Sequence, residues 1–200
     1  MKFSLIYNFK KENDELIVLF SDKKITNKVT AKNLEVCYHE KEIVKYKIYN
    51  ISKIMRIKAE GLIVLPPNAL IDAINSILIQ HNLDKLNYVT DSLFVIGEIK
   101  EIMLKENEKF LYVVNLGQEE NSFVYSKFSN IPVKSKIVIA KNGARLFDNS
   151  RISDVLFIKG TKCAGMICST KDLNIDENDE PLILDDDSII GADFFTSEVK

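Results

Sequence analysis

Short apolar stretches separated by polar turns dominate the first sixty residues of the chain. They are rich in β-branched and aromatic side chains, and one of them, Ile43–Tyr49, partly alternates its apolar residues with Lys45 and Lys47. Alternation of this kind buries one face of a strand and leaves the other in solvent. We therefore expect an antiparallel sheet with strands at Lys2–Phe9, Glu15–Phe20, Leu34–His39 and Glu42–Asn50.

The period of the pattern changes after Leu62–Leu65, a further strand-like run that ends at two prolines. From Ala69 to His81 apolar side chains recur at helical spacing, and Asn68 is a residue type that caps helices well. We therefore expect one amphipathic helix over 69–81 that packs on the sheet. The polar stretch 82–91 is expected to be a linker.

A second series of short strand-like stretches follows. Turn-like residues separate them at 115–121, 142–143 and 148–149. Short strands with such turns predict a closed or partly open Greek-key barrel of the OB type. Its five strands are expected at Leu93–Leu104, Phe110–Leu116, Ser122–Tyr125, Lys136–Ala140 and Val155–Ile158.

Glycine usage also changes between the two series. Gly61 is the single glycine before residue 97, and the other glycines of the chain all follow from Gly97 onward. The sequence therefore predicts an α+β protein of two domains. Residues 1–88 form a small N-terminal α/β domain, an antiparallel sheet plus one helix, and residues 89–200 form a C-terminal OB-fold β-barrel with an acidic C-terminal segment.

The formal charge of the chain is −2, which gives no global sign of a nucleic-acid-binding protein. The sum conceals opposed regions: residues 1–96 carry a net +3, residues 97–171 a net +4 and residues 172–200 a net −9. One acidic segment therefore hides a mildly basic body. If this segment folds back across the barrel, its carboxylates compete with phosphate groups, and its deletion is expected to tighten RNA binding.

Several classes of function find no support in the residues. The N-terminus has no apolar stretch of signal-peptide length and no run approaches the roughly 20 residues of a membrane helix, so we expect a cytoplasmic protein without membrane association. The three cysteines lack a C-x-x-C spacing. The glycines are too dispersed for a phosphate-binding loop, and the acidic run 176–180 has Pro181 where a calcium loop needs glycine. We therefore expect no cofactor and no metal.

Nucleophilic catalysis has little basis either. His39 and His81 stand in different elements, and neither lies beside a serine or cysteine in a pattern that pairs a nucleophile with a base. A Cys-dependent enzyme needs a base near Cys163 or Cys168, and the sequence offers none locally. We therefore expect a protein that is not an enzyme.

Basic and aromatic residues are interleaved in the barrel half. In nucleic-acid-binding proteins such lysines contact phosphates and such rings stack on bases. The solvated face and the core of an ordinary sheet give the same pattern, so composition leaves both interpretations open. The cations are Lys127, Lys134, Lys136, Lys141, Arg145, Arg151, Lys159 and Lys162, and the aromatic residues are Phe123, Tyr125, Phe128, Phe147 and Phe157.

The segment Lys159–Leu173, KGTKCAGMICSTKDL, carries a more specific signal. It resembles the signature R-G-x-x-S-x-G-M-[IL]-C-S-x-x-E-L of the tRNA-binding OB domain found in phenylalanyl-tRNA synthetase β chains and in YtpR-type tRNA-binding proteins. Stretches at 96–99, 137–144 and 185–193 are similar to further parts of that domain. The first half is similar to the α/β domain that precedes the barrel in YtpR-type proteins, with 45–52 at its x-G-Y-N-[IF]-F-N-A-S motif.

The resemblance implies a cytoplasmic, non-enzymatic protein that binds the folded outer corner of tRNA by shape, without codon or amino-acid preference. By analogy with free-standing relatives it also implies a homodimer. Lysines are expected on phosphates, Asn130 as a hydrogen-bonding group, and Met166 against an exposed base or in ordering the loop. The RNA-binding residues implied by motif position are Asn130, Lys141, Lys159, Lys162, Cys163, Gly165 and Met166.

The chain also departs from the family pattern. Residues 105–111 lack the family's H-P-x-A-x-x-L, and 124–130 keep only the Val and Asn of [IV]-V-C-G-A-x-N. Cys163 replaces a serine and Lys159 an arginine. These losses favour weaker RNA binding on a retained fold, or a module that docks a protein partner such as an aminoacyl-tRNA synthetase. An uninterrupted basic face would favour RNA, and an exposed apolar patch would favour a protein.

Overall fold

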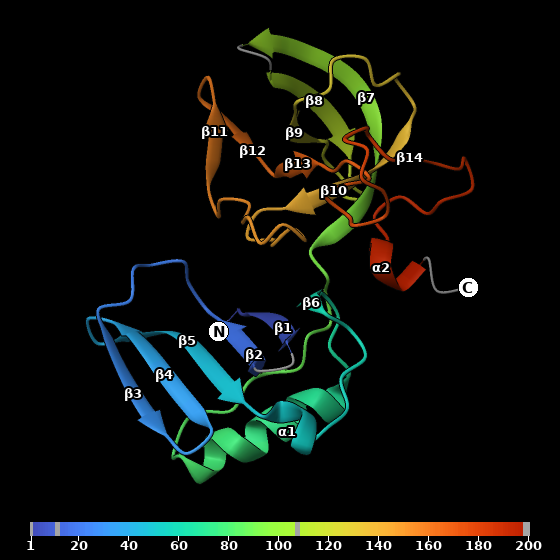
Figure 1. Ribbon diagram of the computed structural model, residues 1–200. Helices are drawn as coiled ribbons and strands as arrows, with labels where there is room; N and C mark the ends of the chain where they lie inside the picture. The colour runs from blue at the N-terminus through green and yellow to red at the C-terminus, as the bar shows by residue number, and fades with distance from the viewer. Residues whose placement is uncertain (1, 11–12, 107–108, 198–200) are drawn as a thin grey trace. The chain divides into compact units, whose positions relative to one another are not determined.

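The chain divides into two compact units, Met1–Thr90 and Asp91–Lys200, in the computed structural model (Figure 1). The structure describes residues 2–10, 13–106 and 109–197. Within these ranges, strands predominate in both units and each unit adds one α-helix. Neither of the described helices is long and apolar enough to cross a membrane.

The first unit contains a six-stranded sheet in which every neighbouring pair is antiparallel. Its order is β3-β4-β5-β2-β1-β6. In β5, Tyr46 and Ile48 are buried while Lys45 and Lys47 are half-buried, as the alternating pattern predicts. The strands are β1 (Ser4–Lys10), β2 (Asn13–Leu19), β3 (Asn27–Ala31), β4 (Leu34–His39), β5 (Glu42–Tyr49) and β6 (Gly61–Ile63).

Helix α1 (Asn68–Gln80) packs on one face of this sheet. Asn68, predicted as the cap, is instead the first helical residue, because the extended Pro67 before it occupies the cap position. At the other end Asn82 is left-handed (φ 57°), and the N–H of Leu83 donates to the carbonyl of Leu78 at 2.9 Å, which closes the helix. The buried stripe that joins the core of the sheet is Leu70, Ile71, Ile74, Ile77 and Leu78.

The polar stretch after α1 packs against the helix and is not a free linker. The N–H of Leu86 donates to the Asn75 side chain at 2.7 Å, and the Asn75 amide donates back to the Leu86 carbonyl at 3.0 Å. The Leu86 side chain is buried in the same core. The Tyr88 hydroxyl donates to Asp72 at 2.6 Å. Because of these contacts the stretch after α1 belongs to the first unit, which ends at Thr90.

The second unit is a closed five-stranded barrel, which agrees with the expected OB-like architecture. Its sheet runs β13-β9-β8-β7-β10-β14, and an additional pairing of β13 with β10 closes the ring. Strands β9 and β13 are parallel, and the other neighbours are antiparallel. The barrel strands are β7 (Phe94–Glu106), β8 (Lys109–Asn115), β9 (Ser122–Ser126), β10 (Lys136–Lys141) and β13 (Gly165–Ile167).

The fifth barrel strand is β13, so the prediction of a barrel strand at Val155–Ile158 is wrong. That segment forms β11 (Leu156–Ile158), which pairs with β12 (Thr161–Cys163) in a separate two-stranded sheet. A Cβ atom at Gly165 would lie 2.2 Å from the carbonyl oxygen of Ala140. The close pairing of β13 with β10 therefore requires glycine, a residue that weakens the sequence pattern of a strand.

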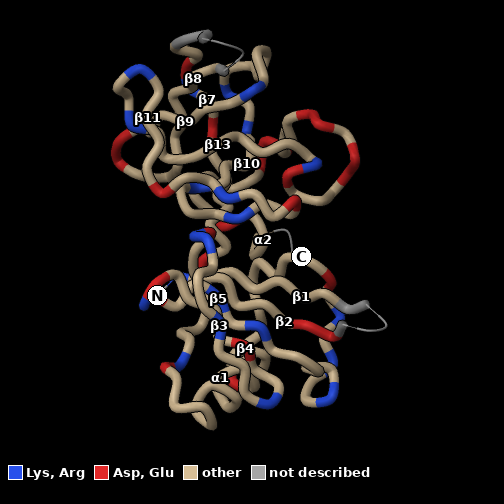
Figure 2. Tube along the Cα trace, turned by 60° about the vertical axis from the view of Figure 1, so that its left-hand side comes forward, with Lys and Arg blue, Asp and Glu red and all other residues tan. Residues whose placement is uncertain are grey.

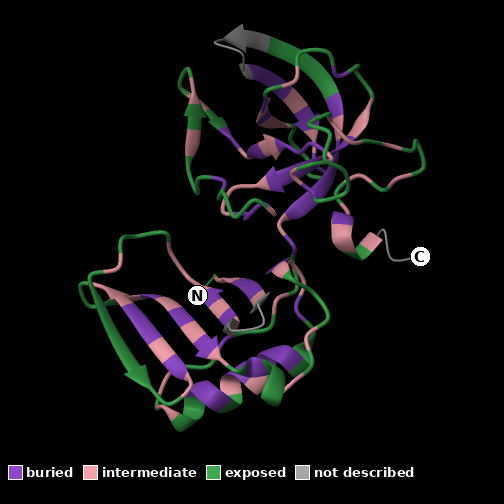
Figure 3. Ribbon diagram, viewed as in Figure 1, coloured by how far each residue is buried: buried purple, intermediate pink, exposed green. Residues whose placement is uncertain are grey.

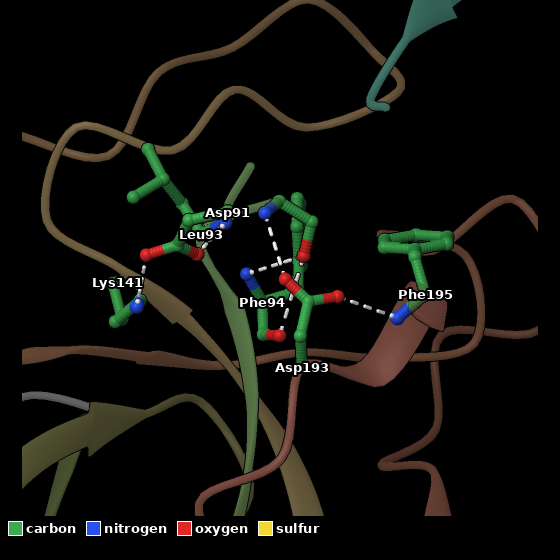
Figure 4. A network of polar contacts seen from close by, with 7 residues as sticks. Asp91, Leu93, Phe94, Lys141, Asp193 and Phe195 are labelled. Atoms are coloured by element: carbon green, nitrogen blue, oxygen red, sulfur yellow. Dashed lines mark hydrogen bonds and ion pairs between the residues drawn. The ribbon is translucent and has the colours of Figure 1, made fainter. Parts of the chain in front are cut away.

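The acidic C-terminal segment is folded onto the barrel. Strand β14 (Ile183–Leu184) pairs with β10. Before the short helix α2 (Phe194–Ser197), the carboxylate of Asp193 accepts hydrogen bonds from the N–H groups of Ser92 at 2.7 Å and Phe195 at 3.0 Å (Figure 4). The segment therefore completes the second unit. Its deletion would remove part of the fold, so the deletion test expected from the sequence would not isolate an effect on RNA binding.

Candidate nucleic-acid interface

Strands β9 and β13 carry apolar and aromatic side chains on the outer side of the barrel. Val124 belongs to the interior cluster, so the alternation of β9 turns Phe123 and Tyr125 outward, where both are half-buried. Ile167 likewise faces the interior, which turns Met166 outward, and Met166 is the register partner of Tyr125. We call Phe123, Tyr125 and Met166 the outer face.

The hairpin β11–β12 adds charge beside this outer face. Phe157 and Lys162 are register partners and both are exposed, whereas Leu156 and Cys163 on the opposite side of the hairpin are half-buried and buried (Figure 3). The two-residue turn consists of Lys159 (φ 47°) and Gly160 (φ 79°). Two positive φ values in succession are typical of the tight hairpin turn that fixes strand register.

Asn142 anchors the hairpin to the barrel. Its side-chain amide donates to the carbonyl of Cys163 at 2.8 Å, and its backbone N–H donates to the carbonyl of Ala164 at 3.0 Å. The N–H of Ala164 in turn donates to the carbonyl of Phe123 in β9 at 2.7 Å. Sequence reasoning marked Asn142 only as a turn residue and as part of the stretch 137–144 that resembles the family, and did not predict that it anchors the hairpin. The outer face and the hairpin are therefore one connected structure.

The cations of the barrel half do not form an uninterrupted basic face. Lys141 forms an ion pair with Asp91 (Nζ to Oδ2, 2.8 Å; Figure 4), and Lys127 forms one with Asp179. Three other cations donate to carbonyl or carboxylate oxygens. They are Lys136 (to Ser188), Arg145 (to Asn149) and Arg151 (to Asp154). The other cations of this set, Lys134, Lys159 and Lys162, are exposed, and two of them, Lys159 and Lys162, lie together on the hairpin.

Carboxylates of the acidic segment reach the end of β9. The hydrogen bond from Lys127 lowers the pKa of the Asp179 carboxyl. Burial raises the pKa of Tyr125, and the negative charge of Asp172 raises it further. The N–H of Thr170 donates to the carbonyl of Glu180 at 2.9 Å, which folds this part of the segment into a loop (Figure 2, red). An anion that approaches Lys127 therefore competes with Asp179.

The structure brings three of the seven predicted RNA-binding residues to one surface. Lys159 and Lys162 are exposed on the hairpin, where Figure 2 shows basic residues at its tip, and Met166 is half-buried on the outer face. Lys141 lies at the end of β10, on the opposite side of that strand from Ala140, the register partner of Met166. Asn130 is exposed in the segment between β9 and β10.

Cys163 and Gly165 lie inside the second unit. The Cys163 side chain is 0 % exposed, and burial raises the pKa of its thiol. In these positions the contribution of both residues is to hold β12 and β13 in place. Cys168 is also buried, and burial raises the pKa of its thiol. Neither thiol is an accessible nucleophile, so the Cys-dependent alternative loses its chemical basis.

Two points of the sequence analysis remain, the departure from the family motif at 105–111 and the question of a metal site. The departure from the family motif at 105–111 falls partly on residues 107 and 108, which lie outside the described residues. Within the ranges that the structure describes, no three His, Cys, Asp or Glu side chains are grouped so that they hold a metal ion.

About half of the chain is similar to a subunit of an aminoacyl-tRNA synthetase. The "Phenylalanine--tRNA ligase beta subunit" of Lactococcus lactis is 32 % identical over 92 residues, which are 46 % of this chain and 11 % of the relative. The same subunit of Streptococcus pneumoniae is 29 % identical over 52 % of this chain and 14 % of its own length, and that of Bacteroides fragilis 28 % over 49 % and 13 %. No family model matches the chain.

Proposed function

We propose that the chain is a non-catalytic tRNA-binding protein of the YtpR type, which grips folded RNA with the hairpin β11–β12 and the adjoining outer face. The observation that carries this proposal is the pair Lys159 and Lys162, exposed on a hairpin of fixed register beside the outer face. OB folds bind oligonucleotides with the face of their second and third strands and with the loop between the fourth and fifth. In this barrel the third strand is β9, and the hairpin lies between the fourth strand, β10, and the fifth, β13.

The relatives and the motif point to tRNA as the RNA. The relatives are beta subunits of phenylalanine–tRNA ligases, and Lys159–Leu173 resembles the tRNA-binding domain of such subunits. Helical RNA hides its base edges in a deep groove, so a small set of lysines contacts phosphates and reads shape. The proposal extends to the domain division at 88/89, to a homodimer and to a cytoplasmic location.

The experiment is fluorescence anisotropy of labelled, folded tRNA at several salt concentrations. We expect the double substitution Lys159→Ala/Lys162→Ala to weaken binding at least tenfold, because each lysine that binds a phosphate releases counterions from the RNA, and its removal forfeits that entropy gain. The slope of log K against log salt is expected to fall by about 1 for each lost phosphate contact.

A matched control uses two exposed lysines of the first unit, in the double substitution Lys24→Ala/Lys58→Ala. It removes the same charge from the protein, so a general electrostatic effect would weaken both variants alike. The proposed site predicts loss in the hairpin variant alone. Equal loss in both variants, or no binding of tRNA by the wild-type protein at tens of micromolar, contradicts the proposed function.

One observation favours a second function, the docking of a protein partner. Val155 is 58 % exposed and Phe157 is 57 % exposed, and they lie close in the chain, Val155 just before β11 and Phe157 within it. Exposed apolar neighbours are typical of protein interfaces. Calorimetric titration with a purified phenylalanyl-tRNA synthetase tests this function. Binding that Val155→Ala/Phe157→Ala abolishes, together with no tRNA binding by the wild type, would favour it over the first proposal.

A further inference from the structure

Phe157 stands apart from the other aromatic residues of the second unit. It is 57 % exposed, whereas every other aromatic side chain in this unit whose burial the structure describes is buried or half-buried. A phenylalanine left in water gives up most of the free energy that its burial would contribute. The hairpin alternation that places Leu156 toward the barrel is regular, so the exposed position of Phe157 is built into the strand and is not a frayed end.

The hairpin holds Phe157 rigidly beside a cation. Its register partner on β12 is Lys162, and side chains of directly opposed residues start about 5 Å apart on the same face. The tight turn at Lys159 and Gly160 fixes this register. Asn142 donates hydrogen bonds to the carbonyl groups of Cys163 and Ala164, which follow Lys162 in the chain, and these bonds hold the base of the hairpin to the barrel. The backbone that carries the ring is therefore ordered before a ligand binds, which lowers the entropy cost of binding.

We propose that Phe157 is a stacking platform for an unpaired base of the bound RNA, with Lys162 on the phosphate of the same or the next nucleotide. The inference rests on the proposed function and narrows its ligand. A π-face stacks on any base, so the platform selects for an unstacked nucleotide and not for a sequence. Bases in a regular RNA duplex are stacked inside the helix, so the preferred ligand is folded RNA with splayed loop bases.

The charge around Phe157 favours RNA over an apolar protein surface. Lys162 lies directly opposite the ring and Lys159 forms the tip of the same hairpin. No Asp or Glu is part of β11, β12 or the turn between them. Fully buried interface cores are depleted in charged residues, and lysine is depleted there in particular. An aromatic ring flanked by cations is instead the arrangement found on single-stranded nucleic-acid platforms.

The test measures stacking directly with 2-aminopurine, whose fluorescence falls when it stacks. The probes are a stem–loop RNA with 2-aminopurine at an unpaired loop position and a blunt duplex with 2-aminopurine in a pair. We expect wild-type protein and Phe157→Trp to bind the stem–loop with a change in fluorescence. We expect Phe157→Leu, which keeps apolar bulk, to bind the stem–loop about tenfold more weakly and without the fluorescence change, because it removes the aromatic face on which the base stacks.

Val155→Ala is the matched control, because Val155 is equally exposed just before β11 but has no π-face. We expect the stem–loop affinity of Val155→Ala to stay within twofold of wild type. We expect Phe157→Trp, Phe157→Leu and Val155→Ala to bind the duplex with the affinity of the wild-type protein. Equal weakening by Val155→Ala and Phe157→Leu would indicate an apolar docking surface and overturn the stacking proposal.

The failure of stacking is distinguishable from the failure of RNA binding. If Phe157→Leu binds the stem–loop as wild type does while Lys159→Ala/Lys162→Ala still weakens binding, the stacking proposal is overturned and the RNA-binding function stands. If the wild-type protein binds neither tRNA nor the stem–loop, both proposals fall.

Discussion

The two halves of one short motif serve different purposes in this protein. Residues 159–162 form the end of the hairpin β11–β12, whereas residues 163–168 lead from β12 into the barrel and contain β13. The first half presents Lys159 and Lys162 to solvent. The second half contains Cys163 and Gly165, which are buried. A motif that resembles a binding signature is therefore in part a packing signature, and burial separates the residues that offer atoms to a ligand from those that position them.

The largest effect is expected from Gly165→Ala, in the buried half. The added Cβ would lie 2.2 Å from the carbonyl oxygen of Ala140, and the backbone there cannot yield without opening the pairing of β13 with β10. We expect the second unit to lose about 3 kcal/mol of unfolding free energy and its midpoint to fall by about 10 °C. Differential scanning calorimetry measures this. A midpoint within about 2 °C of wild type would contradict the packing role of Gly165.

A smaller effect on stability is expected from Gly160→Ala, in the exposed half. No atom lies within 4 Å of the Cβ that would be added, but the positive φ of 79° is strained for alanine. The strain costs about 1 kcal/mol and loosens the turn that sets the hairpin register. We expect tRNA affinity to fall a few-fold while the calorimetric midpoint of the barrel changes by only a few degrees. A Gly160→Ala variant that unfolds as readily as Gly165→Ala would break the distinction between the two halves.

The smallest effect is expected at the acidic segment, from Asp179→Asn. The substitution removes the ion-pair partner of Lys127 beside the outer face. Because the pair is half-exposed, its net contribution is small, and we expect tRNA affinity to rise about twofold to threefold at low salt. Glu177→Gln, which removes one charge from the same loop, is the control. Equal gains in both variants would attribute the effect to net charge and not to the release of Lys127.

Apolar periodicity predicted the helices and strands that are long enough for burial of one face to repeat along the element. The apolar stripe of Leu70, Ile74 and Leu78 predicted a helix over 69–81, and each end lies one residue from the observed end of α1, because one face of an amphipathic helix must be apolar. Strand β3 (Asn27–Ala31) was missed because all its residues are exposed, so no alternation marks it. Strand β13 has three residues and begins with glycine, and the more strand-like Val155–Ile158 took its place in the prediction.

The same limits apply to the candidate site. The family resemblance selected Lys159, Lys162 and Cys163 together, because a sequence motif does not record which side chains face inward. The composition of the acidic segment is dominated by its charge and does not indicate how the segment is attached to the barrel. Its attachment depends on backbone hydrogen bonds and on the side chain of Asp193, and neither leaves a periodic signal in the sequence.

Hydrogen–deuterium exchange of the full chain with and without folded tRNA tests the central claim most directly, because it reports on both halves of the motif in one experiment. We predict that tRNA slows exchange in peptides that cover β11, β12 and their turn. We predict no change in β13, whose pairing with β9 and β10 already protects it. Unchanged exchange in the hairpin, with tRNA bound and protection elsewhere on the chain, would contradict the account.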